Sequence, residues 1–365
     1  MNEFDFIRRL RKQTSAHTTS ARIVTGIGDD AAIFRQASDR DLVISTDLLV
    51  EGVDFHREAT PPQFLGHKAL AVSLSDIAAM GARPLFALVS IGMSERAWDT
   101  NLKDDFFKGY LTLADRFGVT LTGGDISEAA QLVIDSIVIG EVQMGRAILR
   151  SGARPRDQIF VTGNLGGAAA GLKLIELGAR LRSPPVREGN ESQQAAGGGR
   201  QQLANDAAQA PSGLNDTADD EAIQQLLLRQ LAPQPRVGWG IVLGEEQLAT
   251  SMIDISDGLS SDLHHLCTES NVGATIDAAS LPLDEGVKYL CGRRALDPLA
   301  LALHGGEDFE LLFTVSPENV SRLPKRVDGV GISRIGEITE QSGVAKIREK
   351  NHEWSLQPEG FQHFI

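Results

Sequence analysis

The chain has 365 residues, of which 42% are hydrophobic and 23% charged, a composition typical of one large or two ordinary globular domains. Its 35 Lys and Arg residues against 49 Asp and Glu residues give a formal net charge of -14, which argues against a broad nucleic-acid-binding surface. No apolar run is long enough for a transmembrane helix, the first twenty residues lack the apolar core of a signal peptide, and 2 cysteines are too few for a disulfide framework. We therefore expect a soluble cytoplasmic protein without membrane or nucleic-acid partners.

Helices and strands alternate in the first half of the sequence. Residues 1–20 are expected to form an amphipathic helix, because Phe4, Ile7 and Leu10 fall on one face. The apolar strand that follows residue 40 is expected to break at Ser45. Further helices are predicted over 61–81 and 99–117, and strands over 85–93, 119–125 and 132–142.

The pattern restarts near residue 151, where a turn leads into a strand and then into a helix rich in Gly and Ala. We therefore predict two domains, 1–148 and 149–365. Within the second domain, residues 182–220 are rich in Gly, Gln, Asn, Asp, Ala and Pro and contain no aromatic residue. Such a segment cannot bury enough apolar area to offset its ordering entropy, so we predict a disordered insertion there.

Acidic residues recur beside Gly, Ser or Thr in six separate segments, most of them directly after an apolar run. Any one of these pairs is typical of an ordinary turn. The whole set is harder to explain in that way, because carboxylates gathered at strand ends repel one another unless cations lie between them. The acidic residues are Asp29, Asp30, Asp47, Asp76, Asp125, Asp254, Asp257, Glu307 and Asp308.

Oxygen ligands on turns suit Mg²⁺, and small neighbouring residues leave room for a phosphate chain near the backbone. If the six segments converge, they form a site that holds several metal ions against a polyphosphate, which is what phosphoryl transfer requires. The sequence contains no P-loop, no protein-kinase HRD and DFG pair, no nucleophile elbow and no zinc-binding histidine pair. Residues 166–173 lack the lysine and hydroxyl of a P-loop, and we interpret them as a site of close helix packing.

Together these motifs carry a family resemblance. In this order, GIGDDAA, STDLLVEGVDF, HKALAVSLSDIAAMGARP, GGD, SGARPRD, IDISDGLSSDL and GGEDFELLFTV resemble the thiamine-monophosphate kinases, which belong to the superfamily of aminoimidazole ribonucleotide synthetase. The resemblance covers the chain apart from 182–220. It implies an α/β (α+β) fold of two domains, in which the N-terminal domain forms a β-barrel across a homodimer and the C-terminal domain is α/β.

The resemblance also implies an activity. The γ-phosphate of ATP would pass directly to thiamine monophosphate in the presence of several Mg²⁺ ions, giving thiamine diphosphate and ADP. The acceptor is already a phosphate monoester, so no acid or base catalyst is needed, and bringing two anions together is the main barrier. The principal metal-holding groups would be Asp47 and Asp125, and Arg150 would add a fixed positive charge on the phosphates.

The resemblance assigns the remaining motif residues to three groups. The metal ligands would be Asp30, Ser45, Thr46, Asp47, Asp76, Asp125, Asp254 and Asp257. The ATP contacts would be Gly124, Asp125, Arg150 and Ser256. The thiamine end would contact Glu307 and Phe361, for which the alternatives are a metal ligand or turn acid and a residue that packs the C-terminal tail.

One motif departs from the family pattern. The family often has a VEGVHF-like run whose histidine contacts the substrate, whereas this chain has VEGVDF, with Asp54 at that position and His56 two residues later. Residues two apart on a strand point to one face, so His56 can substitute for the family histidine. Alternatively, Asp54 pairs with the thiamine cation.

Two other classes of function are weighed against this one. The first is another ATP-dependent enzyme of the same superfamily, such as a ligase, a selenophosphate synthetase or a hydrogenase-maturation protein. A selenophosphate synthetase is expected to have a reactive Cys near its N-terminus and the maturation protein a C-terminal Cys, whereas this chain has its first Cys at 267 and ends in QHFI. The second is a non-catalytic protein that binds metal or nucleotide.

Overall fold

A computed structural model describes residues 23–25, 29–35, 39–182, 217–294, 296–350 and 352–362. The helix expected over 1–20 and residues 183–216 of the expected insertion lie outside these residues. The predicted end of the insertion at 220 is wrong, because Thr217–Leu231 forms helix α6. Asp219 and Asp220 stand in its first turn, where negative charge is stabilised by the helix dipole.

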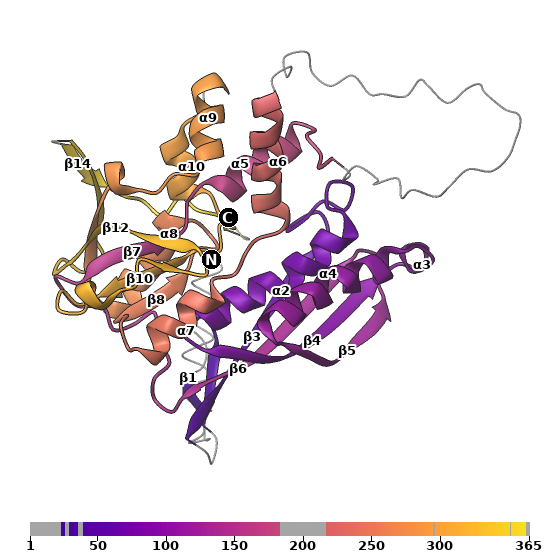
Figure 1. The fold of residues 1–365 in the computed structure, drawn as a ribbon, viewed down its shortest axis with the longest axis horizontal. Coiled ribbons are helices and arrows are strands. Elements are labelled where there is room, and N and C mark those ends of the chain that lie inside the picture. The colour runs from indigo at the N-terminus through magenta and orange to yellow at the C-terminus, as the bar shows by residue number, and fades with distance from the viewer. Residues whose placement is uncertain are drawn as a thin grey trace, which may run out of the picture.

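The first half of the chain forms a mixed sheet of six strands in the order β1-β2-β3-β6-β4-β5, in which only the β4–β5 pair is parallel. The strands are β1 (Ile23–Thr25), β2 (Ala32–Arg35), β3 (Arg40–Val50), β4 (Arg83–Met93), β5 (Thr120–Glu128) and β6 (Val133–Gln143). The helices of this half are α2 (Pro62–Ala79), α3 (Glu95–Trp98) and α4 (Leu102–Phe117). Figure 1 shows α2 and α4 lying side by side on one face of the sheet.

Local sequence explains these elements. Buried and half-buried residues alternate along β6, as a strand with one face on the core requires. A proline at the first position starts α2, and Gly118 ends α4 in the left-handed conformation at φ 68°. No helix that the structure describes is both long and apolar enough to cross a membrane.

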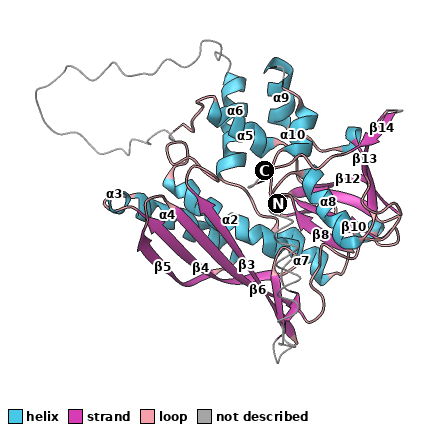
Figure 2. Cartoon of the chain, turned by 180° about the vertical axis from the view of Figure 1, so that it is seen from behind, coloured by secondary structure: helices cyan, strands magenta, loops and turns pink. Residues whose placement is uncertain are grey.

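The second half forms a mixed sheet of eight strands, with the path β14-β13-β9-β12-β7-β10-β8 and β11 paired to β12. The strands are β7 (Gln158–Thr162), β8 (Ser251–Asp254), β9 (Gly273–Asp277), β10 (Leu311–Val315), β11 (Arg326–Val327), β12 (Val330–Thr339), β13 (Ala345–Glu349) and β14 (His352–Ser355). The helices are α5 (Gly167–Glu176), α6, α7 (Val237–Glu245), α8 (Leu259–Ser270), α9 (Glu285–Arg294) and α10 (Pro298–His304), with 3-10 turns η1 (Ala278–Ser280) and η2 (Val320–Arg322). Figure 2 shows the two sheets on opposite sides of the molecule, with α2 and α7 between them.

The two halves meet through close helix packing. A Cβ atom added at Gly240 of α7 would lie 2.2 Å from the carbonyl oxygen of Ala78 in α2, so the two helices touch through their backbones. The same holds within the second half, where a Cβ atom at Gly171 of α5 would lie 2.1 Å from the carbonyl oxygen of Leu226 in α6. The interpretation of 166–173 as a packing segment is therefore confirmed.

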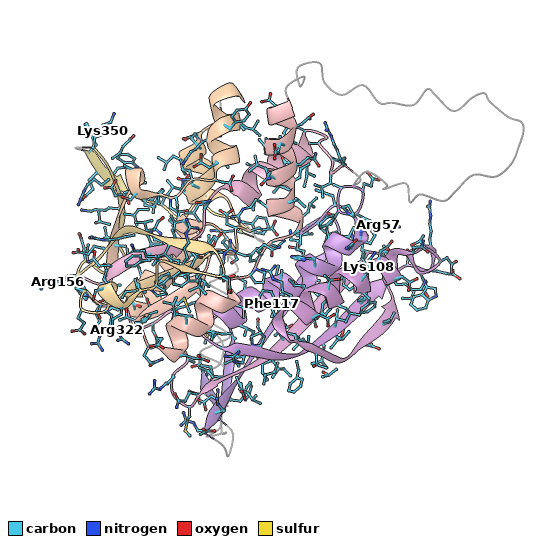
Figure 3. All side chains as sticks on the ribbon, viewed as in Figure 1. Arg57, Lys108, Phe117, Arg156, Arg322 and Lys350 are labelled. Carbon is cyan, nitrogen blue, oxygen red and sulfur yellow. The ribbon has the colours of Figure 1, made fainter. Side chains whose placement is uncertain are left out.

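Charged side chains such as Arg57, Arg156 and Arg322 lie at the periphery on separate elements (Figure 3).

The expectation that the acidic motifs lie in turns after strands is wrong for two of them, while Asp76 lies in the helix predicted over 61–81. Strand β3 does not break at Ser45 but continues to Val50, because it pairs with β6 along its whole length. Strand β5 likewise runs through Gly123, Gly124 and Asp125. Asp76 lies inside helix α2, in a stretch that is otherwise almost entirely buried.

Candidate active site

Four aspartates from distant segments come together where the two halves of the chain meet. Oxygen atoms of Asp30, Asp76 and Asp254 all lie within 4.8 Å of one another. The fourth, Asp47 on β3, lies close enough to Asp76 for a hydrogen bond with it. We call these four residues the acid cluster. The sequence-based prediction that the motifs converge is confirmed for these members.

Hydroxyl groups surround the acid cluster but do not neutralise it. The Oγ atom of Ser45 donates to the Oδ2 atom of Asp76, as predicted for a residue of this site. The Oγ atom of Ser75 donates to the Oδ2 atom of Asp254 at 2.6 Å. In the described part of the chain, the buried Oδ2 atoms of Asp30 and Asp47 have no hydrogen-bond partner. Because unpartnered buried oxygens are costly, these two atoms indicate a site for an external cation.

Electrostatics supports this interpretation. Burial, together with repulsion from Asp47, Asp254 and Asp30, raises the pKa of Asp76 well above its ordinary value. Burial and the nearby Asp30 raise the pKa of Asp254 to about 8. Burial also raises the pKa of Asp47 to about 6. At neutral pH the acid cluster therefore retains protons unless a cation replaces them, and its all-oxygen donor set fits Mg²⁺.

A single arginine borders the acid cluster. The Nε atom of Arg150 donates to the Oδ1 atom of Asp30 at 3.1 Å, and its backbone N–H lies 3.3 Å from the Oδ2 atom of Asp29. Burial opposes the charge of Arg150, but Asp30 raises its pKa overall, so the guanidinium stays charged. Burial and the neighbouring Asp30 raise the pKa of Asp29 to about 7.

A second acidic group lies at the start of α8. Single ligand atoms of Asp257, Asp262 and His265 lie within 4.8 Å of one another. The carboxylate of Asp262 accepts the backbone N–H of Asp257 at 3.2 Å and that of Gly258 at 3.0 Å, which fixes the turn into the helix. Burial and Asp257 raise the pKa of Asp262 well above its ordinary value. Asp257 thus belongs to a neighbouring group and not to the acid cluster itself.

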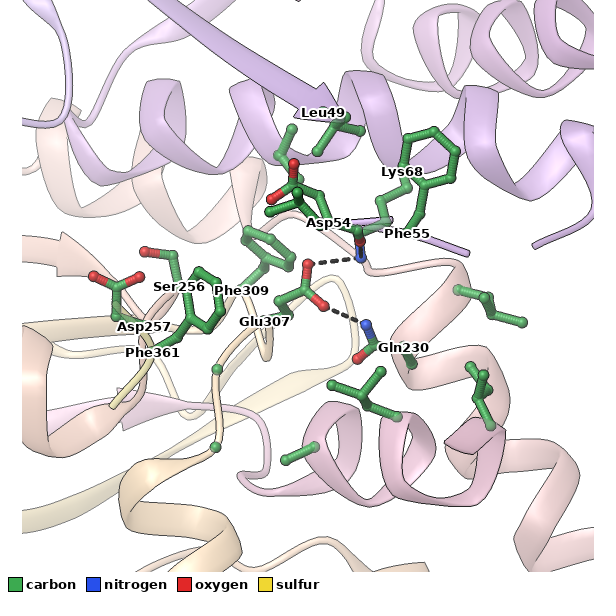
Figure 4. A pocket seen from close by; sticks show the side chains of 18 of the residues that line it. Leu49, Asp54, Phe55, Lys68, Gln230, Ser256, Asp257, Glu307, Phe309 and Phe361 are labelled. Atoms are coloured by element: carbon green, nitrogen blue, oxygen red, sulfur yellow. Dashed lines mark hydrogen bonds and ion pairs between the residues drawn. The ribbon is translucent and has the colours of Figure 1, made fainter. Parts of the chain in front are cut away.

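A cavity of about 640 Å³ opens beside the acid cluster, and Asp47 lines it. We call it the interdomain cavity, because α2 and the turn after β3 form one wall and α5, α6 and the turn before β10 form the other. Its wall includes the aromatic rings of Phe55, Phe309 and Phe361 (Figure 4). Six further residues predicted from the sequence line it: Asp54, His56, Ser256, Asp257, Glu307 and Phe361.

The segment that contains Asp54 and His56 is a turn, because β3 ends at Val50. The argument that both residues share one face of a strand is therefore wrong. The carboxylate of Asp54 accepts the backbone N–H of Val50 at 2.8 Å and so closes the turn, while His56 is exposed at the rim. Both residues line the interdomain cavity, and which of them contacts a substrate stays open.

The Gly-Gly-Glu-Asp turn before β10 holds its residues in an unusual backbone conformation. Glu307 has φ 65° and Phe309 has φ 49°, both in the left-handed region that non-glycine residues rarely adopt. Glu307 and Phe309 line the cavity. Asp308 points the other way and accepts the backbone N–H groups of Gly166 at 2.6 Å and Ala168 at 3.0 Å, which caps α5.

The neighbouring Glu310 anchors the same turn. Its carboxylate, which is fully buried, pairs with Arg236, lies 3.3 Å from Arg229, and accepts the hydroxyl of Thr162 at 2.7 Å. Burial disfavours the charge, but the Arg236 guanidinium lowers the pKa of Glu310 overall. This neutralised network holds the turn on the side away from the cavity, and apart from the acidic motif it could not be predicted from the sequence.

Three further predicted residues belong neither to the acid cluster nor to the lining of the interdomain cavity. The Oγ1 atom of Thr46 donates to Asp135 at 2.6 Å, and Thr46 is exposed while its neighbours in β3 on either side face inward. Asp125 is exposed on β5, the edge strand of the first sheet. A Cβ atom at Gly124 would lie 1.9 Å from the carbonyl oxygen of Val89, so only glycine fits there. Their assigned roles stay predictions.

Sequence reasoning missed several residues of the site. Lys68 of α2 pairs with Glu307, and Gln230 of α6 donates to the other oxygen of the same carboxylate. Asp262 and His265 complete the second acidic group. A lysine inside the apolar run of α2 was the one available signal, because a charge in a buried helix requires a partner.

Comparisons with known proteins agree with this arrangement. The model of the AIR synthase related protein N-terminal domain matches residues 28–142, and that of the C-terminal domain matches residues 157–348. Thiamine-monophosphate kinase of Escherichia coli K12 is 35% identical over 370 residues, covering 99% of this chain and 98% of the relative. Thiamine-monophosphate kinase of Bacillus subtilis is 32% identical over 369 residues and covers 100% of both. The chain belongs to the thiamine-monophosphate kinase family.

Solved structures of family members have the same fold. A structure described as AaThiL complexed with AMPPCP and TMP has a TM-score of 0.78 and 28% identity, and covers 100% of this chain and 97% of that one. The thiamine-monophosphate kinase of Stenotrophomonas maltophilia has a TM-score of 0.69 and 33% identity, with 96% and 97% covered. The expected two-domain α+β fold of the AIR synthase related proteins is therefore confirmed.

Proposed function

We propose that this protein transfers the γ-phosphate of ATP to thiamine monophosphate, giving thiamine diphosphate and ADP. One observation carries the proposal: the acid cluster, which lacks neutralising partners on two oxygens, borders a cavity whose other walls carry aromatic rings. The interdomain cavity can thus hold the phosphates and their metal ions at the acid cluster and a ring of the substrate at the aromatic side chains. Relatives of this chain are named thiamine-monophosphate kinase, and one family structure is described as a complex with AMPPCP and TMP.

The chemistry follows from charge. Mg²⁺, when bound, neutralises phosphate oxygens and keeps them in line for transfer. The residues of the chain hold the site in place: Asp30, Asp47, Asp76 and Asp254 supply oxygen ligands, and Arg150 stays charged beside them. The phosphate of the acceptor is itself the nucleophile, so no residue need remove a proton from it.

We assign the remaining predicted ligands on the same basis. Ser45, Thr46, Asp125 and Asp257 complete the metal set, with Asp125 on its exposed strand joining when the phosphates bind. Gly124, Asp125, Arg150 and Ser256 contact ATP. Several Mg²⁺ ions are expected, because the acid cluster and the group at Asp257 are distinct.

The thiamine end of the acceptor occupies the aromatic part of the cavity. Phe361, whose side chain is 49% exposed, presents its ring to the cavity while its backbone N–H donates to the carbonyl of Asp257 at 3.0 Å. Such a ring can stack on a cationic heterocycle. Glu307 and either Asp54 or His56 supply the polar contacts.

The domain limits and the dimer belong to this proposal. We place the domains at 1–148 and 149–365, so that each contains one sheet. The face of the first sheet that α2 and α4 leave open exposes Leu48 and Phe86 at 58% and 44%. Large exposed apolar side chains on one sheet are typical of an interface, and a second copy would close the sheet into a barrel. Sedimentation of the purified protein should show a dimer.

The decisive experiment is an incubation with ATP, Mg²⁺ and thiamine monophosphate, followed by chromatography of the products. We expect equal amounts of thiamine diphosphate and ADP, and neither product when Mg²⁺ is chelated. ADP release that needs a different acceptor would favour another enzyme of the superfamily. Binding of ATP with Mg²⁺ but no turnover on any phosphate acceptor would favour a non-catalytic role.

A further inference from the structure

Lys68 is a buried cation in the wall of the interdomain cavity. Its side chain is 2% exposed, and among the described residues that line the cavity no other lysine or arginine is buried. It belongs to α2, in the first half of the chain. Burying an ammonium group is costly unless a partner compensates it, so the contacts of Lys68 explain why it is there.

The partner of Lys68 comes from the other half of the chain. The Nζ atom lies 2.6 Å from the Oε1 atom of Glu307, and it also donates to the carbonyl oxygen of Asp54 at 3.4 Å. The amide of Gln230 donates to the Oε2 atom of the same glutamate. Figure 4 shows the carboxylate held between Lys68 and Gln230, with Phe309 and Phe361 nearby. Lys68 thus connects the turn after β3 with the turn before β10.

Glu307 is therefore fixed from two sides. Its backbone is held in the left-handed region by the anchors of Asp308 and Glu310, and its carboxylate by Lys68 and Gln230. A carboxylate offers about four lone-pair positions, so two contacts leave others open toward the cavity. The side chain of Glu307 is 28% exposed, which leaves it accessible to a ligand.

Pairing also changes what Glu307 can recognise. An unpaired glutamate attracts a cation such as a thiazolium ring, whereas a glutamate already neutralised by an ammonium group at 2.6 Å has little net charge to offer. Such a carboxylate still accepts hydrogen bonds from neutral N–H donors, for example an aminopyrimidine. The thiazolium cation is then left to the aromatic rings of the cavity.

We propose that Lys68 is a positioning residue for the acceptor: it holds Glu307 so that this carboxylate recognises thiamine monophosphate by accepting a hydrogen bond and not by pairing with its positive charge. The inference rests on the proposed function and names how the acceptor is selected. A double-mutant cycle tests it with Lys68→Met, Glu307→Gln and the double variant, while Lys68→Arg keeps the charge. Lys346→Met, which removes an exposed pair with Glu353, is the matched control.

The readouts are the KM values for both substrates, kcat, and the affinity for thiamine monophosphate measured by calorimetry without ATP. We expect Lys68→Met to weaken binding of thiamine monophosphate at least about tenfold, with the KM for ATP unchanged within about threefold. Lys68→Arg should bind thiamine monophosphate more tightly than Lys68→Met does. The double variant should bind thiamine monophosphate no more weakly than whichever single variant has the lower affinity, because the two residues act together.

Tighter binding by Lys68→Met would overturn the inference, because it would mean that a freed Glu307 pairs with the cation. Unchanged binding would overturn it as well. If Lys68→Met does not fold, Gln230→Met tests the same carboxylate from its other oxygen, with the same expected weakening and the same contrary result. Calorimetry measures binding without turnover. A protein that binds thiamine monophosphate but forms no thiamine diphosphate would therefore refute the proposed function, and the effect of Lys68 on binding could still be measured.

Discussion

Two groups of buried carboxylates lie close together in this molecule and differ in how their charge is compensated. In the acid cluster, burial and repulsion from neighbouring aspartates raise the pKa values of Asp76 and Asp254. Behind the turn that precedes β10, Arg236 and Arg229 compensate the charge of Glu310, and the pKa of Glu310 is lowered. Of these two groups, the one without a compensating cation borders the interdomain cavity, whereas the one paired with arginine supports the fold.

The largest expected effect concerns the neutralised group. Replacing Glu310 with Gln leaves the guanidinium group of Arg236 buried without a counter-charge and removes the nearest carboxylate from Arg229, so we expect a loss of roughly 3 kcal/mol or more in the free energy of unfolding. Chemical denaturation measures it. Glu353→Gln, on an exposed pair, is the control and should change little. A stable Glu310→Gln variant would contradict the distinction between the two groups.

The opposite result is expected for the unneutralised group. Asp76→Asn removes one of several repelling carboxylates, so the metal-free protein should gain stability, while kcat should fall by about a hundredfold, since charge stabilisation of the transition state is lost. Steady-state kinetics and denaturation of the same sample measure both. Asp115→Asn, on the exposed face of α4, should change neither. An Asp76→Asn variant with full activity would remove Asp76 from the metal site.

The pH dependence of stability offers a third test. An unfolded aspartate titrates near 3.8, whereas Asp254 titrates near 8 in the fold, so between these values the folded protein holds more protons than the unfolded chain. Stability of the metal-free protein should therefore fall as pH rises through this window. Mg²⁺ competes with those protons, so it should raise the apparent Tm more at about pH 8 than at about pH 6.

Calorimetric scans with and without Mg²⁺ provide the measurement, and Asp254→Asn provides the control, because it should flatten both dependences. An apparent Tm that rises steadily with pH in the absence of metal would show that the acid cluster is not the dominant buried acid.

The smallest expected effect is at the ring-binding end of the cavity. Phe361→Ala should raise the KM for thiamine monophosphate by about threefold to tenfold and leave kcat nearly unchanged, because stacking acts on the bound substrate before transfer. Trp354→Ala, at an exposed aromatic residue on β14, is the control. An unchanged KM together with a lower Tm would show that Phe361 only packs the C-terminal tail.

The sequence allowed much of this site to be predicted, and its errors have physical causes. The family resemblance named Asp30, Asp47, Asp76 and Asp254 as members of one site, and charge repulsion indicated that such a group needs cations if its segments converge. The expected break of the strand before Asp47 did not hold, because β3 pairs with β6 along its whole length and so continues through the acidic motif. The strand argument for His56 did not hold either, because β3 ends at Val50.

The sequence by itself determined most helices and strands, because periodicity and capping depend on neighbouring residues. It also determined the family motifs and indicated the need for cations, because the repeated acids can be seen in the sequence. Only the tertiary structure decided which acids are neutralised by arginine and which lie buried together without such a partner. It also decided that Lys68 meets Glu307. These outcomes depend on distances between residues far apart in the chain, and no local rule of sequence contains such distances.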